Sequence, residues 1–267
     1  MLLSKLWKRR KRLFLIPMLL LVLIVGALYA LLSDPMKNKE VFDGLPESYT
    51  YLEAESFGKV KLHMMSLTPD HVTLRAAGTP LRQVKAYGIN GGFFYGEDLL
   101  SIAIMNDVPV SGDKNAYGSG WFNAKYPRGT LVWDGSSQRF SVQVVSSGDD
   151  LEVSDRSQYF AQGGISMNLQ NEDQWLTSVT QEHLPFADEQ RMRSGMVYDN
   201  TGKLWLIVTP SRCTAAEFRT AILESIPGEG LEGIFLDGDG SSQMNASEVV
   251  IIGDQRMIVQ MIAVDGD

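Results

Sequence analysis

Cysteine and histidine are both scarce in this sequence, which has one cysteine and three histidines in 267 residues. The single thiol, Cys213, cannot form an internal disulfide, and a domain of this size does not need one. His63, His71 and His183 lack the short paired spacing that zinc ligands show. We therefore expect neither a disulfide framework nor a histidine-based metal centre.

Positive charge is scarce beyond the N-terminus. The chain has a formal charge of -8, yet six basic residues and no acidic residue lie within 1–12. The remaining residues are therefore more acidic than the whole chain. Such a domain repels the phosphates of nucleic acids, and no basic stripe along it offsets this repulsion. No nucleic-acid partner is expected.

Charge is absent altogether from residues 13–32, an apolar run of twenty residues. A helix of that length crosses the hydrocarbon core of a bilayer, and the basic segment 1–12 before it is of the kind that stays in the cytoplasm. We predict a single-pass membrane anchor with a cytoplasmic N-terminus and an extracytoplasmic domain. A cleaved signal peptide is the alternative, although Ala27 and Ala30 are spaced wrongly for its cleavage site. Both interpretations export the rest of the chain.

The remainder is predicted to contain a tether and one folded domain. Residues 33–50 contain two prolines and a glycine without hydrophobic periodicity, which is typical of a tether. Residues 51–267 show mostly strand patterns and few helix signals. We predict an α+β fold for them: a single β-rich mixed domain with few helices, preceded by the transmembrane helix.

Apolar residues alternate at period two in the stretches 60–64 and 72–76, which flank a Thr-Pro-Asp turn at 68–70. This pattern predicts a hairpin of half-buried strands. The clearest helix signal covers 215–225, where Thr214 can cap the N-terminus. Further strands are predicted at 86–89, 129–133, 140–145, 195–198, 204–209, 233–236, 248–252 and 257–264.

The first segment of unusual composition is Asn90-Gly91-Gly92-Phe93-Phe94, directly after a predicted strand. Asn-Gly is a strong hairpin signal, so an ordinary turn is one interpretation. The doubled glycine followed by two aromatics favours a ligand-binding loop, because glycine lets the backbone approach a ligand closely. Residue types alone leave both interpretations open.

The second unusual segment, 237–242, reads Asp-Gly-Asp-Gly-Ser-Ser and follows an apolar strand. Its glycines allow successive amides to point into one anion-binding concavity, and its carboxylates could assist a reaction. A calcium-type loop is the alternative, because Asp-x-Asp-Gly also begins such sites. An EF-hand counted from Asp237 would need glycine where Ser242 lies, but a different metal geometry stays open.

Together these segments resemble a known family. Asn-Gly-Gly-Phe-Phe at 90–94 and Leu-Asp-Gly-x-Gly-Ser-Ser-x-Met at 236–244 are similar to the two signature loops of the phosphodiester glycosidase family. The segments 161–164 and 193–196, and the stretch from Arg256 to Val264, resemble its middle and closing segments more diffusely. The chain departs from the family at Asp239, where members more often have glycine.

The resemblance implies hydrolysis of a sugar 1-phosphodiester at the anomeric carbon, with Asp237 and Asn90 as catalytic residues. Asp237 is expected to act as a general base or charge stabiliser, and Asn90 to orient sugar hydroxyls or phosphate. Arg193 is expected to supply a bidentate positive charge, although a surface role beside Arg191 is equally compatible with the sequence. The substrate-binding set implied is Gly91, Gly92, Arg193, Gly238, Asp239, Gly240, Ser241 and Ser242.

The expected partner is a phosphorylated glycan or glycosyl phosphodiester, such as a wall polymer or exopolysaccharide. No cofactor is required on this interpretation, but a divalent metal at Asp237 and Asp239 stays open. Two other functions also stay open. One is a glycan-binding module of the same fold without catalysis, and the other is a metal-dependent phosphodiesterase that cleaves the P–O bond.

Overall fold

Sheet dominates the computed structural model, which describes residues 42–56 and 59–266. The described residues from Gly44 onward belong to one compact unit, Gly44–Asp267. The predicted basic segment 1–12, the predicted membrane span 13–32 and the start of the tether lie outside the described residues.

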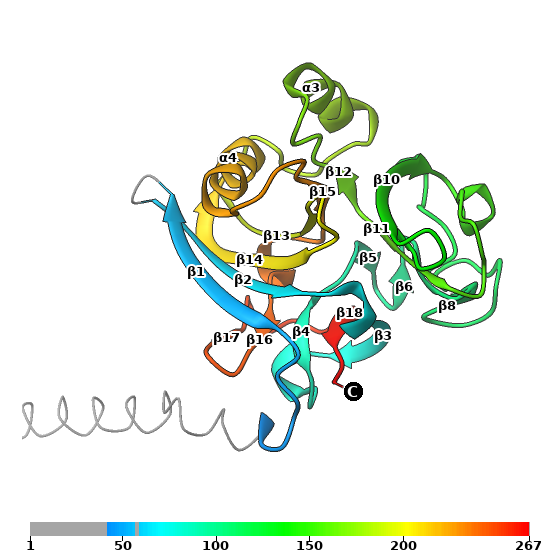
Figure 1. Ribbon diagram of the computed structural model, residues 1–267, viewed down its shortest axis with the longest axis horizontal. Coiled ribbons are helices and arrows are strands. Elements are labelled where there is room, and N and C mark those ends of the chain that lie inside the picture. The colour runs from blue at the N-terminus through cyan, green and yellow to red at the C-terminus, as the bar shows by residue number, and fades with distance from the viewer. Residues whose placement is uncertain (1–41, 57–58, 267) are drawn as a thin grey trace, which may run out of the picture. The chain divides into compact units, whose positions relative to one another are not determined.

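Within the described residues of the unit Gly44–Asp267, the strands form three antiparallel sheets and a small hairpin (Figure 1). The six-stranded sheet has the order β1 (Thr50–Ser56), β2 (Val60–Leu67), β14 (Leu204–Cys213), β13 (Arg191–Tyr198), β15 (Glu232–Phe235) and β12 (Ile165–Ser166). One five-stranded sheet has the order β10 (Arg139–Val145), β9 (Arg128–Asp134), β11 (Tyr159–Gly163), β7 (Ala103–Met105) and β8 (Val108–Pro109). The other has the order β17 (Val250–Ile251), β16 (Met244–Asn245), β4 (Tyr87–Asn90), β18 (Ile258–Val264) and β3 (Val72–Thr79). The hairpin is β5 (Phe94–Tyr95) with β6 (Asp98–Leu99).

The predicted fold class, an α+β domain preceded by a transmembrane helix, is wrong. The described residues contain only two α-helices, α3 (Glu172–Gln181) and α4 (Ala215–Ser225), so the fold is mostly β. Several strands, among them β14 and β18, contain short runs of consecutive buried apolar residues, which are typical of strands covered on both faces. Within residues 42–56 and 59–266, no helix is long and apolar enough to cross a membrane.

The predicted hairpin of 60–64 with 72–76 is also wrong, although both stretches are strands. β2 pairs with β1 and β14, whereas β3 pairs with β18 in a different sheet. A 3-10 turn at Pro69–His71 separates them and leads the chain from one sheet to the other. β2 lies inside its sheet and is almost entirely buried on both faces. The alternation in its sequence therefore does not separate a solvent-exposed face from a buried face.

The helix predicted at 215–225 is confirmed as α4, Ala215–Ser225. Thr214 and Glu217 form a capping box, in which each side chain accepts a hydrogen bond from the backbone N–H of the other. α4 packs on β1 and β2 (Figure 1). It buries Phe218 and Ile222. This core continues to Phe93 and Phe235, which form part of the wall of the cavity described below.

Candidate active site

The two predicted loops meet in space, because the strands that precede them end side by side. Asn90 ends β4, and Asp237 follows β15 by two residues. The backbone N–H of Asp237 donates to the carbonyl of Gly91 at 3.2 Å. The chain then returns through Met244, which pairs with Ile89. The segments 90–94 and 236–244 therefore form one structural unit.

Asn90 is the polar centre of this unit and is only 1% exposed. Its Nδ2 donates to the carbonyl of Asp237 at 2.7 Å and to the carbonyl of Gly91 at 3.3 Å. Its Oδ1 accepts from the hydroxyl of Ser194 at 2.8 Å and from the backbone N–H of Gln243 at 3.1 Å. Protein groups therefore use the hydrogen-bonding capacity of this amide, and the side chain clamps the two loops together.

Gly91 and Gly92 are required by packing against a buried glutamine. A Cβ on Gly91 would lie 1.6 Å from Oε1 of Gln260. The N–H of Gly92 donates to that same oxygen at 3.0 Å, and a Cβ on Gly92 would lie 2.5 Å from Cβ of Ser101. These glycines were predicted to contact substrate, but neither is among the residues that line the cavity.

A cavity of about 130 Å³ opens beside the loop that follows β15. Its charged lining residues are two aspartates and three arginines, and its apolar walls come from aromatic and aliphatic side chains. The lining residues are Phe93, Leu184, Pro185, Phe186, Arg191, Arg193, Phe235, Leu236, Asp237, Gly238, Asp239 and Arg256. Such a combination of apolar walls with a few convergent charges is typical of a small-molecule site.

Asp237 is half-buried at this cavity. Burial raises the pKa of its carboxyl to about 6, because the charged form loses solvation. The hydroxyl of Ser241 and the charge of Arg256 act in the opposite direction, as does the N–H of Gly238, which donates to Oδ1 at 3.1 Å. The negative charge of Asp239 adds to the increase in this pKa. The carboxylate can therefore exchange a proton near neutral pH.

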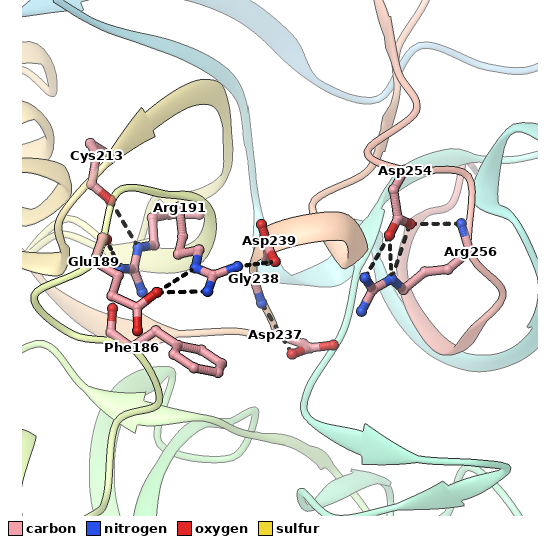
Figure 2. Close-up of polar contacts among 10 residues, drawn as sticks. Phe186, Glu189, Arg191, Cys213, Asp237, Gly238, Asp239, Asp254 and Arg256 are labelled. Carbon is pink, nitrogen blue, oxygen red and sulfur yellow. Dashed lines mark hydrogen bonds and ion pairs between the residues drawn. The ribbon is translucent and has the colours of Figure 1, made fainter.

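Asp239 lies in a left-handed backbone conformation, with φ at 54°. Its Oδ2 accepts a hydrogen bond from Nη1 of Arg191 at 2.8 Å, and Arg191 also pairs with Glu189 at 2.6 Å. Figure 2 shows these contacts, with Asp237 between Arg191 and Arg256 in that view. Asp239 thus supplies a charge to the cavity that is already neutralised by Arg191.

Arg193 is 5% exposed and binds backbone carbonyls rather than a carboxylate. Its Nη2 donates to the carbonyls of Phe186 and Glu189 at 2.6 and 2.9 Å, and its Nε donates to that of Cys213 at 3.3 Å. Burial lowers the pKa of this guanidinium. In the described part of the chain Nη1 forms no hydrogen bond, so this nitrogen keeps its donor capacity.

The other predicted loop residues take different places. Gly238 lines the cavity, whereas a Cβ on Gly240 would lie 2.1 Å from Oδ2 of Asp254. Ser241 and Ser242 are fully buried, and neither hydroxyl forms a hydrogen bond of ordinary geometry within residues 42–56 and 59–266. The Ser241 hydroxyl nevertheless lies close enough to Asp237 to lower the pKa of its carboxyl.

The sequence prediction missed Arg191, Arg256 and the apolar wall at 184–186. This wall belongs to the connection between α3 and β13, in which His183 and Phe186 both have positive φ values, 54° and 53°. No sequence motif marks that connection. The one available signal was the two-residue spacing of Arg191 and Arg193, which favours the same side of a strand.

No cluster of three or more histidine, cysteine, aspartate or glutamate side chains that could hold a metal exists within the described residues. Asp239, one of the two proposed metal ligands, is hydrogen-bonded by Arg191. The Asp239 carboxylate is therefore already paired with a positive charge.

Comparison with known proteins finds a similar fold but no similar sequence. No family model and no curated protein sequence matches the chain. Among solved structures, it resembles the catalytic domain of zebrafish N-acetylglucosamine-1-phosphodiester alpha-N-acetylglucosaminidase, auto-inhibited by pro-peptide, with a TM-score of 0.55 and 13% identity over 84% of this chain and 85% of that chain. A hypothetical protein from Synechocystis aligns with a TM-score of 0.42 and 12% identity over 81% of this chain and 61% of that chain. The chain therefore has a fold similar to that of a phosphodiester glycosidase.

Proposed function

We propose that this protein is a hydrolase that cleaves sugar 1-phosphodiesters at the anomeric carbon. The observation that carries the proposal is a half-buried carboxyl, Asp237, whose pKa is raised to about 6 in a cavity lined by three arginines. A carboxylate that titrates near neutral pH suits general-base or charge-stabilising catalysis. Arginines beside it suit a phosphate, whose oxygens the planar guanidinium matches.

In the proposed reaction, water attacks the anomeric carbon and the bond from this carbon to the phosphate oxygen breaks. The sugar gains the water oxygen, and the phosphate leaves as a monoester that is stabilised by arginine. Asp237 accepts the water proton or stabilises the oxocarbenium-like transition state. A phosphodiester leaving group needs little protonation, so one ionisable carboxylate in the cavity is sufficient for this route.

Asn90 acts as a positioning residue in this proposal. Its side chain contacts the backbone of Asp237, and its other polar contacts are with protein groups. Among the arginines, Arg193 supplies a nitrogen without a hydrogen bond to described residues, and Arg256 lies close enough to Asp237 to lower the pKa of its carboxyl.

The proposed substrate is a glycosyl phosphodiester within a glycan, wall polymer or exopolysaccharide, and the proposed location is extracytoplasmic. The location is supported by the basic segment 1–12 followed by the apolar segment 13–32. The name of the zebrafish enzyme, which acts on an N-acetylglucosamine 1-phosphodiester, makes that sugar the first to test.

Turnover of a panel of glycosyl phosphodiesters by wild type and Asp237→Asn tests the proposal. We expect sugar release by wild type to fall by about 10²- to 10⁴-fold in the variant, the range of general acid–base contributions. Asp107→Asn is the matched control, because Asp107 is paired with Arg156 and does not line the cavity. Tight glycan binding by both proteins without sugar release would instead identify a binding module.

A further inference from the structure

Asp239 holds an arginine of the cavity in a fixed pair. The backbone at Asp239 is left-handed, a conformation that non-glycine residues adopt at an energetic cost. Its carboxylate nevertheless reaches Nη1 of Arg191 at 2.8 Å (Figure 2). Arg191 also binds Glu189 at 2.6 Å and stacks on Phe186, with 4.6 Å from Cζ to the ring centroid. The Arg191 guanidinium is therefore held in place by two carboxylates and an aromatic ring.

The charges around the cavity are close to balanced as a result. Arg191 has two carboxylate partners, and Arg256 is paired with Asp254. Arg193 has carbonyl partners only, so in the described part of the chain it is the one cavity arginine without a carboxylate in an ion pair. Asp237 adds a negative charge when it is ionised. Once Asp237 is ionised, the site therefore offers no excess positive charge to a ligand.

Substrate and product of the proposed reaction differ in charge. A phosphodiester has one negative charge at neutral pH, whereas the phosphomonoester released from it has close to two, because its second pKa is about 6. A cavity with little excess positive charge can hold the first by hydrogen bonds. It repels the additional charge of the second, since like charges at short range in a partly buried site interact strongly.

We infer that Asp239 is a specificity-determining residue that makes the cavity prefer singly charged phosphodiesters over doubly charged phosphate groups and favours release of the phosphomonoester product. This inference rests on the proposed function and deepens it. It predicts that removal of the Asp239 charge leaves Arg191 paired with Glu189 alone and raises affinity for a dianion more than for a monoanion.

Two small anions test this without knowledge of the sugar. Binding of inorganic phosphate and of dimethyl phosphate is measured by calorimetric or NMR titration at pH 8 and low salt, where the first has about two charges and the second has one. The proteins are wild type, Asp239→Asn and Asp239→Gly. Both substitutions tolerate the left-handed backbone. Asp107→Asn is the control, because Asp107 has φ at 66° and an arginine partner at 2.8 Å but does not line the cavity.

We expect the ratio of phosphate to dimethyl phosphate affinity to rise about tenfold in both Asp239 variants, which corresponds to one additional charge–charge interaction in a partly screened site. The ratio should stay at its wild-type value in Asp107→Asn. An unchanged ratio in the Asp239 variants, or an equal rise in the control, overturns the inference. If wild type binds neither anion, the proposed function fails as well. If the ratio rises as expected but no sugar 1-phosphodiester is hydrolysed, the proposed function fails alone.

Discussion

The side-chain amide of Asn90 donates a hydrogen bond of 2.7 Å to the backbone carbonyl of Asp237, 147 residues further along the chain. This contact joins the end of β4 to the loop after β15, and so joins two different sheets at the cavity. The position of the Asp237 carboxyl therefore depends on a buried side chain that is not itself among the lining residues.

Asn90→Ala should reduce both stability and turnover. The substitution leaves the carbonyl of Asp237, the hydroxyl of Ser194 and the N–H of Gln243 without their partner, which costs about 2–4 kcal/mol of unfolding free energy. Asn245→Ala is a matched control, because Asn245 is equally buried and its Nδ2 binds three carbonyls, of Leu81, Val84 and Ala86, away from the cavity. Chemical denaturation measures the stability loss of each variant, and kcat is measured at a temperature where both variants are folded. Both variants should lose stability, but only Asn90→Ala should also lose turnover.

Catalysis should increase with pH through the pKa of Asp237. If the ionised carboxylate is the active form, kcat/KM rises from pH 4 and reaches a plateau above about pH 7, with a midpoint at the free-enzyme pKa of about 6. Hydrolysis of a glycosyl phosphodiester across this range provides the measurement. An activity that declines with pH between 5 and 7 would show that the protonated acid is the active form.

Stability should respond to pH in the opposite direction. The folded-state pKa of Asp237 is raised from 3.8 to about 6, so the folded protein binds the proton more tightly than the unfolded chain. Protonation of Asp237 in the folded state contributes at most about 3 kcal/mol to the free energy of unfolding. This contribution is fully present below pH 4 and is lost as the pH rises to about 6. The difference in unfolding free energy between wild type and Asp237→Asn should therefore change over that interval and be constant above pH 7. A constant difference from pH 4 to 7 would mean that the pKa is not raised.

Gly91→Ala should destabilise the protein by about 3 kcal/mol or more, because its Cβ collides with the buried side chain of Gln260. Gly96→Ala is the control: no atom lies within 4 Å of its added Cβ, so only backbone strain of about 1 kcal/mol applies. Adding Gln260→Ala to Gly91→Ala removes the collision. A double-mutant cycle should then show coupling of at least about 1 kcal/mol, and simple additivity would contradict the packing explanation.

Arg193→Lys should cost about 2–4 kcal/mol of unfolding free energy, since a lysine cannot replace the bonds to the carbonyls of Phe186, Glu189 and Cys213. Arg191→Lys, at a side chain that is 28% exposed, should cost less than about 1 kcal/mol. Thermal or denaturant unfolding of the two variants gives this comparison directly. Equal stability losses would argue against the role of Arg193 in fixing the cavity wall.

Much of the site was predictable because it depends on residue types that local structure requires. The loops at 90–94 and 236–244 carry glycines where Gln260 and Asp254 leave no room for a Cβ, so their composition is visible in the sequence. α4 was predictable for a similar reason, since Thr214 and Glu217 form a local cap. Patterns that involve only a few neighbouring residues can be recognised in the sequence without knowledge of the tertiary structure.

The rest depends on long-range contacts that sequence patterns do not encode. β2 and β3 pair with strands of different sheets. The closeness of these two strands in the sequence therefore led to a wrong hairpin prediction. α3 was missed because only Trp175 and Ser178 of its ten residues are buried, which leaves a weak apolar face. The carbonyl partners of Arg193 come from the connection after α3 and from β14, and no local pattern could identify them.

The central claim is that water attacks the anomeric carbon beside Asp237, and hydrolysis of a glycosyl phosphodiester in ¹⁸O-labelled water tests it most directly. Mass spectrometry of the two products shows which one acquires the label. The account predicts that the sugar contains the heavy oxygen and that the phosphomonoester contains none. Label in the phosphomonoester would mean cleavage of the P–O bond, and would contradict the account.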